Sequence, residues 1–313
     1  MNELDPNYPS AQRSSWISVL LILMVMLGGF LIVGPLIGMV LAIPFMEGSI
    51  MDILEMMQRP TDHPELKIPL FIIQGVSTFI GLVVGPWIFF FIDKKKSARA
   101  LFVKPKVFPI ALLMTGIVVI FFMVPNSAVI EWNANLTFPS WLNGFDQWAR
   151  SREDMAAEIT TFLTTFDSLG EFIFAFLVVA VLPALGEELV FRGMLQREIQ
   201  KGTNNIHAAI WISAILFSAL HMQFFGFIPR ILLGALFGYL YFWSGNLIVP
   251  VFAHFVNNGF SLIMLYLYQL DIVTVDMESA EAAPSYAIGI FTLLTFGLLI
   301  LLKKNFESLD TRT

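Results

Sequence analysis

Long apolar runs dominate this sequence and restrict the folds open to it. A hydrocarbon core of about 30 Å needs about 20 helical residues. Segments near or above that length lie at roughly 16–45, 68–92, 107–130, 170–192, 206–223, 226–243, 247–268 and 285–302. Lipid offers the backbone no hydrogen-bond partners, so these segments must be helices or lie buried in protein. We therefore predict an all-α fold, a polytopic membrane helix bundle with about eight transmembrane helices.

The composition supports a membrane protein and excludes several functional classes. Hydrophobic residues make up 57% of the chain and charged residues 13%, against about 45–50% and about 25% in soluble domains. The absence of cysteine excludes disulfides, thiolate nucleophiles and Cys-ligated metal sites. No dense basic face is present, so we expect no nucleic-acid partner.

Charged residues near the ends of the apolar runs predict the orientation. Basic residues follow the second, fourth and last runs, and the loops at 47–65 and 271–281 are acidic. The basic residues are Lys94, Lys95, Lys96, Arg99, Lys104, Lys106, Arg192, Arg197, Lys201, Lys303 and Lys304. Because cytoplasmic loops carry the excess of Lys and Arg, both termini are expected in the cytoplasm.

The two halves of the chain differ in where their polar residues lie. Residues 1–169 hold no charge inside a span, and we expect them to form a membrane scaffold of three spans plus an outer interfacial segment. Trp132, Trp141 and Trp148 suit the headgroup zone in that segment. Residues 170–268 form the core that carries the unusual polar residues. Residues 269–313 comprise an outer acidic loop, the last span and a cytoplasmic tail.

Glu187, Glu188 and Arg192 place three charges inside an otherwise apolar span. A charge near the centre of a spanning helix costs about 2.5–3.5 kcal/mol on insertion scales, which indicates a functional site by default. Glu188 and Arg192 are four residues apart and share a helix face, so we predict an ion pair. Glu187 points about 100° away from Glu188. Pro183 and Gly186 favour a kink beside the carboxylates.

Two further polar motifs occur in later spans. Phe217 and His221 lie near the end of the fifth apolar run, and His254 and Asn258 share a helix face in the seventh, with Asn257 as an alternate to Asn258. A single intramembrane histidine or asparagine is often a structural hydrogen-bonding group between helices. Two carboxylates, two histidines and an amide in three spans instead favour one functional site.

These residue types suit direct attack by water on an acyl bond. Ser218 is the only hydroxyl beside the His221 motif, and it lies on another helix face, so no activated nucleophile is offered. A desolvated carboxylate is a stronger base, His221 could share the water or the proton, and a histidine with an amide can stabilise an oxyanion. Hydrolysis of a peptide bond is the simplest such reaction.

A metal site is the alternative interpretation. Glu187, His221 and His254 would make a His₂Glu set, which some catalytic zinc sites use with one position open. No H-E-x-x-H spacing accompanies these residues. We favour no cofactor, with a divalent metal such as zinc as the alternative.

The three motifs, in this order on successive spans, resemble the CAAX prenyl endopeptidase and bacteriocin-processing family (CPBP, or Abi) of intramembrane glutamate-dependent proteases. The resemblance covers about residues 170–265, and the first 169 residues share only hydrophobicity. It implies that residues 170–268 form a CPBP-like protease core. It also implies that Glu187 activates the water, His221 assists it, and His254 with Asn258 stabilises the oxyanion. Supporting positions are Glu188, Arg192, Phe217 and Asn257.

The leading hypothesis is an intramembrane endopeptidase acting on a membrane-tethered substrate, prenylated or bacteriocin-like, near its cytoplasmic end. The partners would then be that peptide or protein and the lipid bilayer. A bacterial inner membrane fits the cysteine-free chain and its short loops. A non-enzymatic membrane adaptor or immunity protein of the same fold is the alternative. A transporter is a third class, but no paired repeat is present and the charges lie in one half.

The expected site carries a geometric condition. At 1.5 Å per residue, His221 would lie about 22 Å from the start of a straight helix near residue 206. Glu187 and His254 lie nearer the cytoplasmic side. A shared site therefore requires region 199–228 to be tilted, broken or partly interfacial. Broken helices are tolerated in a membrane where they line a protein cavity.

Overall fold

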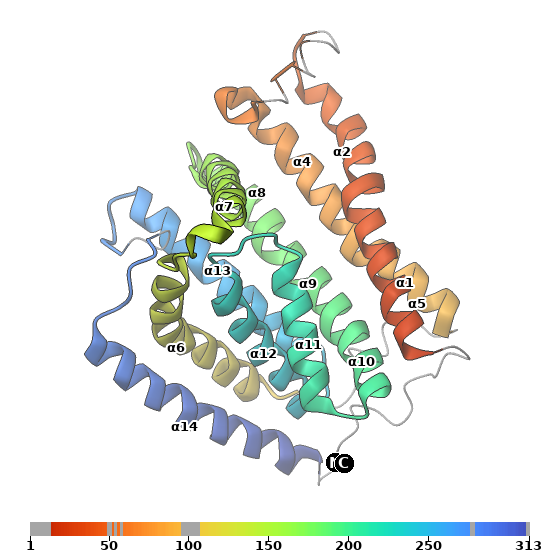
Figure 1. The fold of residues 1–313 in the computed structure, drawn as a ribbon, viewed down its shortest axis with the longest axis vertical. Coiled ribbons are helices and arrows are strands. Elements are labelled where there is room, and N and C mark those ends of the chain that lie inside the picture. Colours follow the sequence, from red (N-terminus) through yellow and green to blue (C-terminus); the bar gives the residue numbers. More distant parts are fainter. Residues whose placement is uncertain are drawn as a thin grey trace.

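A computed structural model describes residues 14–48, 52, 55–56, 59–94, 107–275 and 279–310. Within these residues all regular structure is helical and no strand occurs, which confirms the all-α prediction. Figure 1 shows the helices packed side by side as a bundle. The predicted basic cluster from Lys95 to Lys106, with Asp276 and Glu278 of the acidic loop, lies outside the described residues.

The α-helices follow one another along the chain with short connections. Their bounds are α1 Ser15–Gly28, α2 Gly34–Ala42, α4 Lys67–Thr78, α5 Gly85–Lys94, α6 Pro109–Ala134, α7 Asn143–Thr164, α8 Leu169–Ala175, α9 Leu182–Glu188, α10 Gln196–Thr203, α11 Ile206–Ala219, α12 Phe227–Ser244, α13 Ile248–Gln269 and α14 Ser285–Asp310. Short π-helical segments join several of them into longer rods.

Seven of the rods in the described part are long and apolar enough to cross a membrane. They are Ser15–Phe45, Pro64–Ile92, Pro109–Ala134, Leu169–Thr203, Phe227–Ser244, Ile248–Gln269 and Ser285–Glu307. The chain is therefore a multi-pass integral membrane protein. The predicted orientation, with both termini in the cytoplasm, and the predicted domain boundaries stay predictions.

The fifth expected span, at 206–223, is shorter than predicted. Region 206–223 contains α11, which has 14 residues and ends at Ala219. Asn204 in a left-handed conformation separates α11 from α10, and the Asn205 side chain caps the start of α11. His221 lies beyond the helix end, in the connection to α12. Region 199–228 is thus broken on both sides of α11, as the shared site requires.

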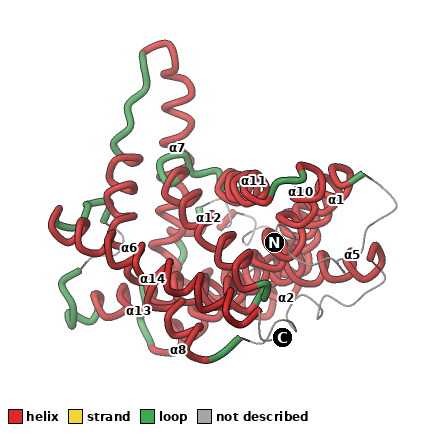
Figure 2. The backbone as a smooth tube through the Cα atoms, turned by 90° about the horizontal axis from the view of Figure 1, so that it is seen from below, coloured by secondary structure: helices red, strands yellow, loops and turns green. Residues whose placement is uncertain are grey.

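The bundle consists of a central group of helices and one group on either side of it. α2 packs on α4, α6 packs on α14, and α11 packs on α12. In Figure 1 the α1–α5 group stands on one side of α9 to α13, and α6 with α14 stands on the other. Figure 2, seen from below, shows α7 and the loop that precedes it projecting away from the other helices.

The connection that follows α6 contains the predicted interfacial segment. α7 is a largely exposed helix of 22 residues that follows α6 after a short 3₁₀ turn. Trp132, Trp141 and Trp148 have exposed fractions of 56%, 78% and 41%. Exposed tryptophans at this spacing fit an interfacial location. The side of the membrane on which α7 lies stays a prediction.

Spans one and two cross at a very close backbone contact. Each contains a π-helical segment, Gly29–Val33 and Phe79–Val84, and the two segments face each other. A Cβ on Gly29 would lie 2.8 Å from Cα of Gly81. A Cβ on Gly81 would lie 2.5 Å from the backbone nitrogen of Phe30. Only glycine fits at this crossing, as at other close contacts between membrane helices.

Replacing Gly29 with alanine should destabilise the bundle by about 1–3 kcal/mol, because overpacking against backbone forces the two spans apart. Gly28→Ala is the matched control, since a Cβ there meets no atom within 4 Å. Thermal unfolding in detergent, followed by tryptophan fluorescence, measures both variants. An unchanged midpoint for Gly29→Ala would contradict the close contact.

Candidate active site

The adjacent carboxylates of Glu187 and Glu188 lie near the middle of the fourth span, at the end of α9. π-Helical segments flank α9 on both sides, at Phe176–Val181 and Leu189–Leu195. Such π-bulges are frequent at functional sites, because the extra residue re-aims the side chains beside it. π-Helical segments therefore flank the carboxylates, and the kink expected at this position stays a prediction.

Pro183 and Gly186 each explain one feature of this segment. Proline has no N–H, so Pro183 cannot donate to the carbonyl of Val179 four residues earlier. The amide of Asn258 on α13 donates to that carbonyl instead, at 3.1 Å. A Cβ on Gly186 would lie 2.6 Å from Cβ of Leu82, so glycine lets span four approach span two.

Glu188 and Arg192 form the predicted ion pair, fully inside the protein. Arg192 Nη1 donates to Glu188 Oε1 at 2.6 Å, and the two side chains are 1% and 0% exposed. Arg192 Nη2 donates to the carbonyl of Gly234 on α12 at 2.8 Å. The guanidinium also lies 4.9 Å from the ring centroid of Phe217 and 5.5 Å from that of Phe237. Arg192 thus contacts a carboxylate, a backbone carbonyl and two aromatic rings.

His254 on α13 connects both carboxylates. Its Nδ1 lies 2.9 Å from Glu188 Oε1, and its Nε2 lies 3.8 Å from Glu187 Oε2. A carboxylate oxygen accepts, so Nδ1 carries the hydrogen in neutral His254. Nε2 then accepts from the amide of Asn258, 3.2 Å away. The Phe237 ring stacks on the imidazole at a centroid distance of 5.3 Å, which fixes the orientation of His254.

Glu187 differs sharply from its neighbour Glu188. The Glu187 side chain is 17% exposed, whereas that of Glu188 is fully buried. Among the described residues, no donor forms a hydrogen bond to the Glu187 carboxylate, and its one near cation partner is His254. Arg230 also interacts with it electrostatically. Glu187 is thus the carboxylate that remains available to bind a water molecule.

His221 reaches the same neighbourhood from the connection after α11. It is exposed, and its Nδ1 lies 2.8 Å from the carbonyl of Phe217, so Nδ1 donates and Nε2 keeps its lone pair. The Phe217 ring centroid lies 5.1 Å from that of His221 and 6.1 Å from that of His254. One aromatic ring therefore lies between the two histidines.

The amides of Asn257 and Asn258 are committed to internal hydrogen bonds. Asn258 Nδ2 reaches both the Val179 carbonyl and His254 Nε2, so both of its N–H groups are in use. Asn257 Nδ2 donates to Asn258 Oδ1 at 3.0 Å. The predicted contact between His254 and Asn258 is present. Direct donation by Asn258 to an oxyanion would require one of these bonds to open.

From the sequence, Arg230 could reach a lipid headgroup or join the site, and its position near a span end favours the headgroup. It instead donates from Nη2 to Oε1 of Gln223 at 2.9 Å and interacts electrostatically with Glu187. Its place one turn into the helix that follows the His221 connection was the available signal. Ser218 donates to the carbonyl of Phe227 at 2.7 Å, so its hydroxyl is occupied.

The alternative metal set of Glu187, His221 and His254 is not assembled among the described residues. Within the described parts of the chain, no group of three or more His, Asp or Glu side chains converges in a way that could hold a metal ion. His254 uses Nδ1 for Glu188, and Nε2 faces Asn258. The side chains therefore do not fit the His₂Glu alternative in this arrangement.

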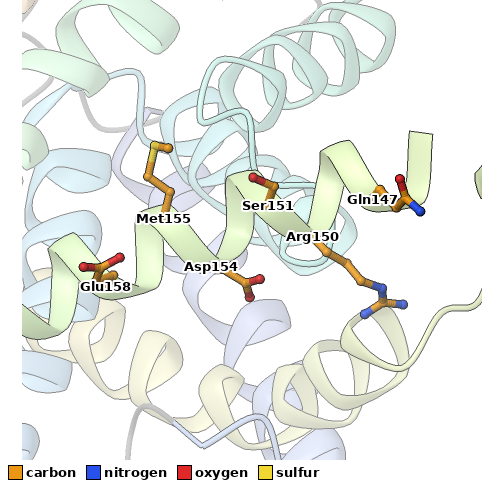
Figure 3. A pocket seen from close by; sticks show the side chains of 6 residues that line it. All are labelled: Gln147, Arg150, Ser151, Asp154, Met155 and Glu158. Atoms are coloured by element: carbon orange, nitrogen blue, oxygen red, sulfur yellow. The ribbon is translucent and has the colours of Figure 1, made fainter. Parts of the chain in front are cut away.

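A shallow surface depression of about 510 Å³ lies elsewhere, along one face of α7 (Figure 3). It is lined by Gln147, Arg150, Ser151, Asp154, Met155 and Glu158. All six residues belong to one exposed helix, and none is a predicted site residue. The depression is open to the surface, unlike the enclosed form of a typical ligand pocket.

Comparison with known proteins agrees with the motifs. Residues 169–260 match the model of the family described as Type II CAAX prenyl endopeptidase Rce1-like. The chain is also 35% identical over 83 residues to the uncharacterized protein YpbD of Bacillus subtilis (strain 168). That match covers 25% of this chain and 39% of YpbD. No solved structure matches the chain at a significant level. The resemblance to CAAX-type endopeptidases is therefore confirmed over residues 169–260.

Replacing Arg192 with methionine should destabilise the protein by about 3–5 kcal/mol, because it leaves the Glu188 charge buried beside a single histidine. The double variant with Glu188→Gln should recover part of this loss, since no charge is then left unpaired. Thermal unfolding measures both, and Arg152→Met on the exposed face of α7 is the control. A double variant no more stable than Arg192→Met would contradict the pairing.

Proposed function

We propose that this chain is a CAAX-type intramembrane endopeptidase that hydrolyses a peptide bond in a membrane-associated substrate. The family match over residues 169–260 supports a CAAX-type protease role in general. The observation that carries the mechanism is the contrast between two adjacent carboxylates. Glu188 is fully buried and accepts hydrogen bonds from Arg192 and His254. Glu187 is partly exposed and accepts no hydrogen bond from the described residues.

Glu187 is the general base in this proposal. It accepts a proton from a bound water, whose oxygen attacks the carbonyl carbon of the scissile bond. The tetrahedral intermediate then expels the amine, which receives that proton as the C–N bond breaks. A base placed within reach of its water contributes about 10²–10⁴-fold to the rate. No covalent intermediate with the protein is formed.

The two histidines, His221 and His254, have different roles in the proposed reaction. His221 keeps a lone pair on Nε2, because Nδ1 is bonded to the Phe217 carbonyl, so Nε2 accepts a hydrogen bond from the attacking water or from the N–H of the leaving group. His254 stabilises the oxyanion only with a proton on Nε2, and Glu188 then balances the resulting cation. Asn258 orients neutral His254 by donating to Nε2, and this hydrogen bond opens when Nε2 takes up the proton.

The substrate and the membrane are further parts of the proposal. A site inside the bilayer suits a peptide held there by a lipid group or an apolar segment, such as a prenylated or bacteriocin-like peptide. The Bacillus relative and the cysteine-free chain support a bacterial inner membrane. The proposal assigns no metal, since no set of three or more His, Asp or Glu ligands occurs among the described residues.

Glu187→Gln should abolish cleavage and leave the fold intact, because an amide of the same shape cannot accept the proton. The rate should fall about 10²–10⁴-fold. Mass spectrometry of membrane peptides from cells producing either protein measures the loss, and thermal unfolding checks the fold. Glu307→Gln is the matched control, since Glu307 is exposed on α14.

Identical peptide products from wild type and Glu187→Gln would contradict the enzyme. If the folded variant also kept its cellular function, a non-enzymatic adaptor or immunity protein would be supported instead.

His221→Ala should lower kcat by about 10²–10⁴-fold and change KM little, because the lost interaction acts in the transition state. Steady-state cleavage of a peptide identified by the preceding comparison measures both constants. His207→Ala is the control, because His207 lies at the other end of α11 and bonds Tyr239. A rise in KM with unchanged kcat would assign His221 to substrate binding.

A further inference from the structure

Arg230 is a cation that makes few hydrogen bonds and no close ion pair with the described residues. It lies on the first turn of α12, and Nη2 donates to the neutral amide oxygen of Gln223. Nη1 is buried and has no hydrogen-bond partner in the described part of the molecule. No described carboxylate lies within the ion-pair distance of 4.0 Å from Arg230. A buried donor left without an acceptor is costly, so such a group usually serves a ligand or a water.

The carboxylates around Arg230 do not neutralise it by contact. Glu153 on α7 accepts from the backbone N–H of Phe225 at 3.2 Å and lies 3.5 Å from Nε2 of Gln223. Burial raises the pKa of the Glu153 carboxyl above its ordinary value. Glu153 and Glu187 both act on Arg230 electrostatically. The chain Glu153–Gln223–Arg230 therefore holds the guanidinium in place and leaves Nη1 unpaired.

Gly226 provides the space in which the guanidinium lies. A Cβ on Gly226 would meet Arg230 Nη2 at 3.0 Å, Cζ at 3.5 Å and Nη1 at 3.6 Å. The φ of Gly226 is −110°, a value that alanine also adopts. A methyl group at this position would therefore push the guanidinium aside without changing its charge or straining the backbone.

We propose that Arg230 binds a carboxylate of the peptide substrate and so sets which peptides reach Glu187. This inference rests on the proposed protease function. A guanidinium matches a carboxylate with two parallel hydrogen bonds, and Nη1 supplies a donor that the protein leaves unused. A substrate carboxylate near Glu187 would be repelled by it, and Arg230 offsets that repulsion. The carboxylate is either the C-terminal one or that of an Asp or Glu side chain.

Matched peptide pools distinguish the two sources. The probes are N-palmitoylated peptides of randomised sequence. One pair of pools contains Asp and Glu and ends in a C-terminal acid or a C-terminal amide. A second pair with the same two ends lacks Asp and Glu, and its amide form is the neutral pool. Wild type should cleave one carboxylate-bearing class about tenfold to a hundredfold faster than its neutral counterpart, the range of a charge-assisted hydrogen bond. Arg230→Gln should abolish that preference, and cleavage of the neutral pool should persist.

Gly226→Ala tests the position of the guanidinium separately from its charge. It should reduce the same preference, because the methyl group displaces Arg230, and thermal unfolding should show an intact fold. Arg152→Gln on the exposed face of α7 is the matched control and should keep the preference. Equal loss of cleavage for acid, amide and neutral pools in Arg230→Gln would overturn the proposal, as would wild type without any preference.

Binding separates this proposal from the protease mechanism. The same pools are titrated against Glu187→Gln and against Glu187→Gln with Arg230→Gln, with bound peptides recovered and identified by mass spectrometry. Enrichment of one carboxylate class that disappears in the double variant would support the carboxylate site even if wild type cleaved no pool. Equal recovery of all pools by Glu187→Gln would overturn it, whatever the outcome for cleavage.

Discussion

The ion pair between Glu188 and Arg192 is the interaction on which the arrangement of the site depends. Both side chains are buried, and an unpaired charge at that depth would be strongly unfavourable. The pair therefore needs further partners, and these come from other helices. Gly234 on α12 gives its carbonyl to Arg192, and His254 on α13 gives its Nδ1 hydrogen to Glu188. Satisfying one buried pair thus fixes three spans relative to each other.

Neutralising Glu188 also creates the difference between the two glutamates. Once Arg192 and His254 Nδ1 bind Glu188, Glu187 is left with His254 Nε2 at 3.8 Å and with its electrostatic interaction with Arg230. Glu187 consequently keeps a carboxylate without hydrogen bonds from described residues, beside a histidine whose orientation is already set. Two identical side chains adjacent in sequence acquire a supporting and a reactive environment because a helix turns about 100° per residue.

Contacts within one helix could be predicted from spacing, whereas contacts between helices could not. The pairs Glu188–Arg192 and His254–Asn258 follow from separations of four residues, and both are present. The hydrogen bond from His254 to Glu188 needs the packing of α13 on α9, which no spacing encodes. The length of α11 was overpredicted because the apolar run continues through Leu220 and Met222, past the helix end at Ala219. The catalytic roles stay predictions.

The break after α11 explains why the site needs the N-terminal half of the chain, although that half contributes none of the predicted site residues. A 14-residue helix starting at one interface rises only about 21 Å, short of a hydrocarbon core of about 30 Å. Its connection to α12 would then expose backbone groups that lipid cannot satisfy. Asn133 on α6 donates to the Phe224 carbonyl and accepts from the N–H of Ile228, and Glu153 on α7 accepts from Phe225. Polar groups from α6 and α7 thus stabilise the irregular connection that carries His221.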